Sequence, residues 1–243
     1  MFDAVLSSLF SVLAPRSCAI CGTDVTRISD GSACDDCWTV TETYAGDEAA
    51  CRKCGLVLAS GRSEGSAMCW HCDGHFYDSA TAIGPYASAL EAEVIALKTA
   101  PKLSRRARDL LSRTFRRSLI DVTTLIVPVP LSRQRYLDRG FNQAEIIGNE
   151  LSREFKIDVD ARSLARTSHS SIHRVGMDRK ARDLSVKNAF TVARPKLVDG
   201  QSVLLVDDVY TTGATLSYCA KALKKFGAAR VNALTLARVI SNI

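Results

Sequence analysis

The sequence predicts an α/β protein in which a parallel sheet flanked by helices follows a small cysteine-rich metal-binding domain. Eight of the nine cysteines lie before residue 73, and from residue 79 onward strand-like and helix-like patterns alternate. The expected strands are apolar on both faces, which is typical of a parallel sheet covered by helices. We therefore expect an amphipathic helix at 1–16, the metal-binding domain at 17–78 and the α/β domain at 79–243.

Composition and charge agree with a globular protein whose core is of ordinary size. The net charge of +6 favours anionic partners only weakly. No apolar run is long enough to span a membrane, and the N-terminal segment lacks the basic start of a signal peptide. We therefore expect a cytoplasmic protein.

The cysteines before residue 73 form four C-x-x-C pairs. Two residues between thiolates allow one turn to place both sulfurs on the same ion, and two such turns complete a tetrahedron around zinc. Gly22 and Gly55 follow two of the pairs, where the turn needs a positive φ. We expect two structural zinc sites, whose ligands are Cys18, Cys21, Cys34, Cys37, Cys51, Cys54, Cys69 and Cys72.

Alternatives to two sequential zinc ribbons stay open on the sequence. Alternating C-x-x-C pairs would give a cross-brace, and the similar intervals only slightly favour sequential ribbons. Disulfides are rare in proteins without an export signal, and an iron–sulfur cluster is less favoured still. His71 and His75 are better explained as exposed or hydrogen-bonded histidines than as ligands. Because Lys and Arg are sparse between 17 and 78, a bracing or protein-contact role is slightly favoured over nucleic-acid binding.

The elements of the α/β domain are predicted from apolar periodicity and turn residues. Leu90, Val94 and Leu97 line one face of the first helix, Gly227 ends the last one, and Cys219 shares that last helix's apolar stripe and is expected in the core. In chain order we expect a strand and turn at 80–88, helices at 89–100 and 104–120, a strand at 124–131, a helix at 141–155, a strand at 201–209, a helix at 214–227 and a strand at 229–239.

The stretch LLVDDVYTTGAT, residues 204–215, predicts a ligand site. Asp207 and Asp208 end a buried strand, and ligands of parallel sheets bind at such carboxyl ends. The loop before the next helix offers backbone N–H groups and hydroxyls to an anion, and it matches neither a Walker nor a dinucleotide-binding loop. A ribose 5-phosphate suits both halves, with its hydroxyls on the aspartates and its phosphate on Thr211, Thr212, Gly213, Ala214 and Thr215.

The residues VLLVDDVYTTGAT at 203–215 resemble the signature with which type I phosphoribosyltransferases bind phosphoribosyl diphosphate (PRPP). Further blocks resemble one branch of that class in the same order: an amphipathic start before the first C-x-x-C, Leu97-Lys98, and VPVPLSRQRYLDRGFNQAE at 127–145. On these motifs, which cover nearly the whole chain, the protein is identified as a member of the ComF family.

The resemblance implies a PRPP-dependent transferase with an unidentified acceptor. Catalytic Asp207 and Asp208 would hold the ribose, and Mg²⁺ would be bound chiefly by diphosphate and ribose oxygens. Residues 139–143 are a candidate acceptor or hood element. Cations suit the departing diphosphate, and the residues expected to bind it are Ser132, Arg133, Arg135, Arg139 and Lys98.

The acceptor is in doubt because two blocks that the family usually shows are altered. Arg174 stands where the family has Gln, and Ser185 stands where it has Asn. His169 and His173, nearby, are better explained as polar loop residues than as bases.

The resemblance also links the chain to competence, the uptake and use of external DNA. It implies two candidate partners, single-stranded DNA on the basic helix at 102–117 and a helicase-type competence protein. A solvated helix face explains the basic residues about as well, and few aromatics accompany them for base stacking. A non-catalytic DNA- or partner-binding scaffold, or a PRPP-sensing regulator, is therefore the alternative to an enzyme.

Overall fold

The computed structural model describes residues 16–25, 31–58, 68–69, 72–167 and 189–240. Its centre is a sheet of four parallel strands in the order β1–β6–β5–β2, so the predicted parallel sheet is confirmed. The strands are β1 Ser79–Pro85, β2 Leu125–Pro128, β5 Ser202–Tyr210 and β6 Arg230–Arg238.

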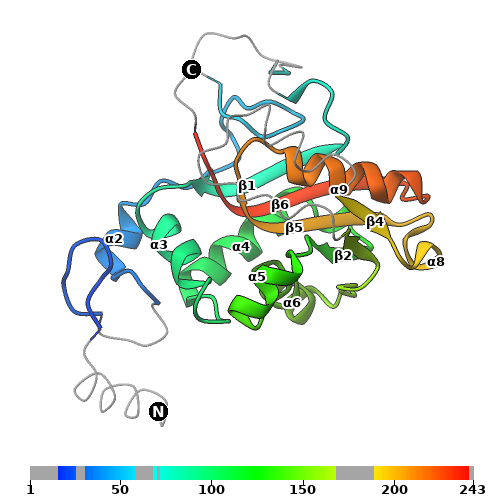
Figure 1. Cartoon of the computed structure of the whole chain (residues 1–243). Coiled ribbons are helices and arrows are strands. Elements are labelled where there is room, and N and C mark those ends of the chain that lie inside the picture. The colour runs from blue at the N-terminus through cyan, green and yellow to red at the C-terminus, as the bar shows by residue number, and fades with distance from the viewer. Residues whose placement is uncertain (1–15, 26–30, 59–67, 70–71, 168–188, 241–243) are drawn as a thin grey trace.

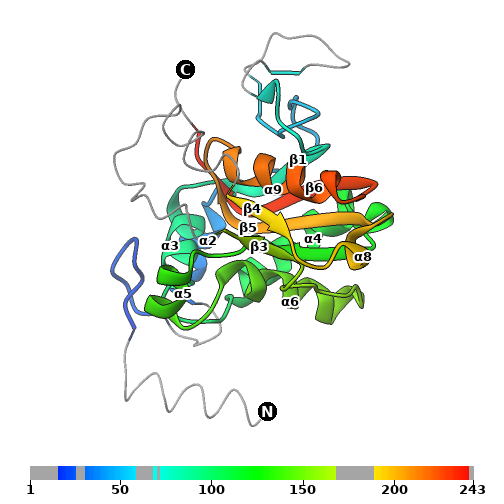
Figure 2. The ribbon, with the colours of Figure 1, turned by 45° about the vertical axis from the view of Figure 1, so that its right-hand side comes forward.

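Helices cover both faces of this sheet, as Figures 1 and 2 show. Side chains alternate along β5: Val203 and Leu205 belong to the apolar cluster that contains α9, whereas Leu204 and Val206 belong to the cluster of the opposite face. The helices are α9 Ala214–Lys225 on the first face and α3 Ser88–Ala96, α4 Arg105–Ser118 and α6 Gln143–Phe155 on the second.

The apolar run of β5 ends where the predicted site begins. Residues 203–206 are buried, whereas Asp207 and Asp208 are half-buried although the strand continues to Tyr210. The connection to α9 is therefore shorter than the sequence indicated, and Thr215 lies in the first turn of the helix. Cys219 is fully buried in the core, as predicted.

Several short elements were not predicted. Their periodicity is too brief to stand out, and no side chain of α5 is buried. They are α2 Asp35–Thr39, the 3₁₀ helix η3 Ile120–Val122, α5 Arg133–Arg139, α8 Pro195–Val198, and the antiparallel pair β3 Leu164–Arg166 and β4 Phe190–Val192.

Some sequence-based expectations lie outside the described residues. These are nearly all of the amphipathic helix at 1–16, and His71, His169, His173, Arg174 and Ser185. Among the helices that the structure describes, none combines the length and apolarity needed to cross a membrane.

Candidate functional site

The eight cysteines before residue 73 gather into two groups of four. Within each group the sulfur atoms all lie within 4.8 Å of one another. Neighbouring C-x-x-C pairs therefore combine sequentially into two ribbons, and the alternative cross-brace is not formed. The first ribbon holds Cys18, Cys21, Cys34 and Cys37, and the second ribbon holds Cys51, Cys54, Cys69 and Cys72.

The sulfur–sulfur distances in both ribbons suit zinc. They are 3.7 Å for Cys21 to Cys34, 3.6 Å for Cys51 to Cys72 and 3.4 Å for Cys54 to Cys69. Four sulfurs bound to one tetrahedral zinc ion lie about 3.8 Å apart, whereas a disulfide would bring two of them to about 2.05 Å. All eight are free cysteines, so the donor set fits two structural zinc ions.

Backbone N–H groups point at the first sulfur of each ribbon. Cys34 N donates to Cys18 Sγ and Cys69 N donates to Cys51 Sγ, each at 3.3 Å. Burial acts to raise the pKa of the Cys18 and Cys51 thiols, but these and neighbouring N–H donors outweigh it and bring each pKa to about 6. Both thiols are therefore favoured as thiolates, the form that binds metal.

A cavity of about 570 Å³ lies at the carboxyl ends of β2 and β5. It gathers side chains from segments far apart in the sequence. Among the predicted site residues, Ser132, Arg133 and Gly213 do not line it. Those that line it are Lys98, Arg135, Arg139, Asp207, Asp208, Thr211, Thr212, Ala214 and Thr215.

The turn between β5 and α9 depends on Gly213. This residue is the N-cap of α9 and has a φ of +79°, a conformation that favours glycine. A Cβ there would lie 2.7 Å from Tyr210 Cζ and 2.8 Å from His75 Cε1, so a side chain would also clash. Thr212 Oγ1 accepts a hydrogen bond from Ala214 N at 3.3 Å. The turn thus presents the N-terminus of a 12-residue helix to the cavity.

Helix α5 carries two of the basic residues that line the cavity. Ser132, which does not line the cavity, caps the N-terminus of this helix. Ser132 is the N-cap of α5, and its side chain accepts a hydrogen bond from Arg135 N. Arg135 and Arg139 then lie one turn apart on the helix and line the cavity together.

The cavity is also lined by three polar residues that were not assigned individually from the sequence. Gln143, inside the block 139–143, is 2% exposed, and its Oε1 accepts a hydrogen bond from Arg139 at 2.8 Å. Arg166 comes from the unpredicted strand β3, and Tyr86 follows β1. Burial, and then the charges of Glu91 and Asp208, raise the pKa of Tyr86. Only the block 139–143 gave a signal, because neither Tyr86 nor Arg166 lies in a recognisable motif.

Comparison with known proteins agrees with this two-part organisation. Residues 9–73 match the double zinc ribbon domain, and residues 138–242 match the phosphoribosyl transferase domain. The sheet itself starts earlier, because β1 at Ser79–Pro85 pairs with β6.

Relatives with similar sequences are named for DNA use or competence. The DNA utilization protein YhgH of Escherichia coli (strain K12) is 29% identical over 93% of this chain and 98% of its own length. Competence protein F of Haemophilus influenzae is 40% identical over 46% of this chain and 49% of its own. Competence protein ComFC of Bacillus subtilis (strain 168) is 32% identical over 52% of this chain and 50% of its own.

Fold, cysteine groups and domain matches define a class: proteins in which a double zinc ribbon precedes a phosphoribosyltransferase domain. Within that class, the sequence is similar to the competence and DNA utilization proteins, in agreement with the ComF resemblance of its motifs.

Proposed function

We propose that this protein binds PRPP with Mg²⁺ in the cavity at the carboxyl ends of β2 and β5 and transfers its phosphoribosyl group to an acceptor. The observation that carries the proposal is the arrangement of charge around this one cavity. The carboxylates of Asp207 and Asp208 lie next to the N-terminus of α9, and Lys98, Arg135 and Arg139 line the same space. A sugar with a phosphate at one end and a diphosphate at the other matches that arrangement.

The 5-phosphate would bind at the turn between β5 and α9. The helix N-terminus carries partial positive charge, and the hydroxyls of Thr211 and Thr215 supplement its N–H groups. The hydrogen bond from Ala214 N to Thr212 Oγ1 is long at 3.3 Å. A phosphate oxygen would replace it with a shorter bond to a charged acceptor.

The reaction would break the bond between C1 of the ribose and a diphosphate oxygen, and the bonding electrons would leave with the diphosphate. The acceptor's lone pair would form the new bond to C1, and the acceptor would lose a proton to solvent water. Asp207 and Asp208 would accept hydrogen bonds from the ribose hydroxyls, while Lys98, Arg135 and Arg139 would stabilise the departing charge. Mg²⁺, held chiefly by substrate oxygens, would neutralise part of that charge.

Gln143 is a further ligand contact in this proposal. Its amide is buried and lines the cavity, and its Nε2 makes no hydrogen bond to any residue that the structure describes. A buried N–H without a partner is unfavourable, so a bound ligand would supply the missing acceptor. Arg139 orients the amide by donating to its oxygen, which leaves the nitrogen to face the ligand.

We infer a role in the use of external DNA from the names of the relatives. A single-stranded DNA contact along α4 receives less support from the side chains. Arg106 pairs with Asp35 at 3.1 Å, and Arg117 donates to the carbonyl of Tyr44 at 3.1 Å. Among the described residues, part of the basic row is therefore already engaged within the protein.

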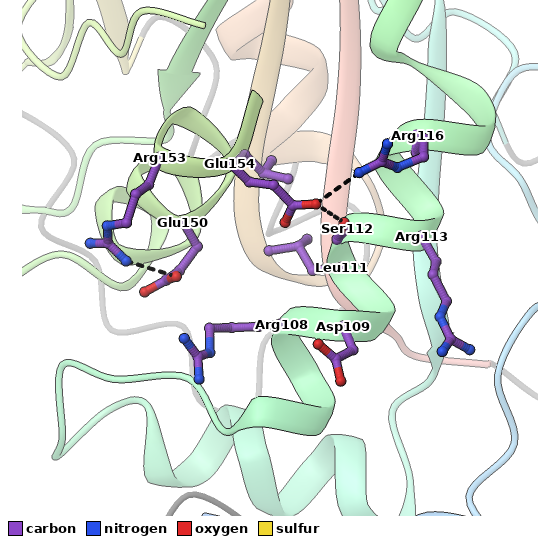
Figure 3. A pocket seen from close by; sticks show the side chains of 10 residues that line it. Arg108, Asp109, Leu111, Ser112, Arg113, Arg116, Glu150, Arg153 and Glu154 are labelled. Carbon is purple, nitrogen blue, oxygen red and sulfur yellow. Dashed lines mark hydrogen bonds and ion pairs between the residues drawn. The ribbon is translucent and has the colours of Figure 1, made fainter. Parts of the chain in front are cut away.

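The hollow between α4 and α6 supports the same conclusion. It measures about 680 Å³, and Figure 3 shows Glu154 turned toward Arg116 and Glu150 turned toward Arg153. Arg116 donates to Glu154 at 3.0 Å, and Arg153 pairs with Glu150 at 2.9 Å. We therefore rank the phosphoribosyl reaction first. Non-catalytic binding of single-stranded DNA or of a helicase-type competence protein is the alternative.

Calorimetric titration of the zinc-loaded protein with PRPP and Mg²⁺ tests the proposal. Wild type should bind saturably, and an Asp207→Asn, Asp208→Asn double variant should bind at least about tenfold more weakly, because each lost charged hydrogen bond is worth roughly 1.5–3 kcal/mol. Asp109→Asn, at an exposed position of α4, is the matched control and should bind like wild type. Absence of binding by folded wild type would contradict the proposal and favour the alternative.

A further inference from the structure

The segment that follows the second ribbon is joined to the cavity turn by a chain of hydrogen bonds. His75 Nδ1 lies 2.6 Å from the hydroxyl of Tyr77, and that hydroxyl lies 2.7 Å from the hydroxyl of Tyr210. Tyr77 is 1% exposed and Tyr210 is 5% exposed, so water does not compete for these bonds. Tyr210 is the last residue of β5, immediately before the turn.

Two of these side chains also pack against the turn between β5 and α9. A Cβ on Gly213 would meet ring atoms of Tyr210 and His75. The rings of these two residues therefore pack directly against the backbone of the turn. Phe76 N donates a hydrogen bond to Ser217 Oγ at 3.1 Å, which attaches the segment to the first turns of α9. Ser217 N in turn donates to the carbonyl of Gly213 at 2.8 Å. Both ends of the turn are thus held by residues 75–77.

Arg238 connects the second ribbon to the same tyrosine. Its guanidinium carbon lies 3.8 Å from the ring centre of Tyr210, and its Nη2 donates to the carbonyl of Cys54. The side chain belongs to a residue that is only 3% exposed. A buried cation is stabilised by such ring and carbonyl contacts. Displacement of the Cys54 backbone would therefore disturb the support of Tyr210.

We propose that the second ribbon and its following segment, His75–Tyr77, position the turn that binds the sugar phosphate. Tyr77 and Arg238 are positioning residues in this view, since they act through Tyr210 and do not line the cavity. The phosphate site then depends on folding of the second ribbon, although none of that ribbon's cysteines lines the cavity. The inference rests on the proposed function, because it concerns affinity for the phosphate end of that ligand.

The test compares two ligands that report on the two ends of the cavity. Ribose 5-phosphate probes the turn, and inorganic diphosphate with Mg²⁺ probes Lys98, Arg135 and Arg139. Tyr77→Phe keeps the ring and removes the hydroxyl that bridges His75 and Tyr210. We expect affinity for ribose 5-phosphate to fall roughly tenfold, because a buried hydrogen-bonded group loses its partner. Diphosphate affinity and zinc content should stay as in wild type.

Two further variants complete the test. Tyr218→Phe removes a hydroxyl from a half-buried tyrosine on α9 and should leave both affinities unchanged. Ser217→Ala breaks the second attachment and should weaken ribose 5-phosphate binding, which keeps the inference testable should Tyr77→Phe fail to fold. Equal ribose 5-phosphate affinity in wild type, Tyr77→Phe and Ser217→Ala would overturn the inference alone, as would a parallel loss of diphosphate affinity. A folded wild type that binds neither ligand nor PRPP would overturn the proposed function and the inference together.

Discussion

The two ribbons carry the same ligand pattern but attach to the α/β domain in different ways. All four cysteines of the second ribbon are buried, and they share an apolar cluster with β-strand residues, Tyr210 and α9. The first ribbon has one exposed cysteine, Cys21, and packs with α3 and α4 on the opposite face. Figure 1 shows the two ribbons at separate places on the domain. The same motif is therefore part of the core in the second ribbon and a peripheral brace in the first.

The first ribbon supports the helix that leads to Lys98. Thr41 is buried, its hydroxyl donates to the carbonyl of Cys37 at 2.6 Å, and the same oxygen accepts from Ala89 N at 3.2 Å. Ala89 lies in the first turn of α3, so Thr41 satisfies one of the free N–H groups there. The first ribbon thus has a short link to the helix that leads to Lys98, whereas the second is linked to the turn between β5 and α9 through residues 75–77.

Loss of a zinc-ligating cysteine should have the largest effect on stability, and the effect should differ between the two ribbons. Cys54→Ser and Cys21→Ser replace the same position in each, and both variants should lose one zinc ion per chain. Because Cys54 lies in the core of the domain, its variant should lower the free energy of unfolding by about 3–5 kcal/mol and abolish ribose 5-phosphate binding. Cys21→Ser should lower it by about 1 kcal/mol and keep that binding. Zinc analysis, urea unfolding and calorimetry measure these quantities.

Equal losses of stability and ligand binding in the two cysteine variants would contradict the comparison. A stronger loss in Cys21→Ser would reverse it, and would make the first ribbon the core element.

The glycines that follow a C-x-x-C pair in each ribbon should give an effect of intermediate size, and they extend the comparison of the two ribbons. Gly22 and Gly55 have φ values of +76° and +68°, so alanine strains both by about 1–2 kcal/mol. No atom of the described part of the chain lies within 4 Å of a Cβ at Gly22, but at Gly55 the Cβ would lie 2.6 Å from the carbonyl oxygen of Ala80 in β1. Gly55→Ala should therefore destabilise the protein by about 2 kcal/mol more than Gly22→Ala in urea unfolding of the zinc-loaded protein. Similar losses would mean that β1 yields to the added methyl group.

Much of the fold and part of the cavity could be predicted because their signals are local. The apolar run 203–206 followed by Asp207 and Asp208 defines a strand, its carboxyl end and a turn within one short stretch. Each C-x-x-C pair is equally local, which is why both zinc sites were expected. The prediction extended to Lys98, Arg135 and Arg139 only through the family resemblance, since no periodicity relates them to the turn.

The remaining features depend on contacts between distant segments. Ser132 does not line the cavity, and it starts a helix whose seven residues have no buried stripe to reveal it. Arg166 reaches the cavity from a three-residue strand whose partner lies beyond position 188. The bond between Tyr77 and Tyr210 joins residues 133 positions apart. Such contacts follow from how the sheet and the second ribbon pack, and no single stretch of sequence encodes them.

Removal of a surface ion pair should have the smallest effect on stability. It tests whether the two ribbons differ only in their buried contacts. Arg106 pairs with Asp35 of the first ribbon, and Lys224 pairs at 2.7 Å with Asp78, just after the second. All four side chains are at least one third exposed, so Arg106→Ala and Lys224→Ala should each cost less than about 1 kcal/mol, and less still in high salt. Asp78 keeps its hydrogen bond from Val231 N, at 2.7 Å, in the second variant. Urea unfolding at two salt concentrations measures both, and a large, salt-resistant loss in Arg106→Ala would make the first ribbon's attachment electrostatic.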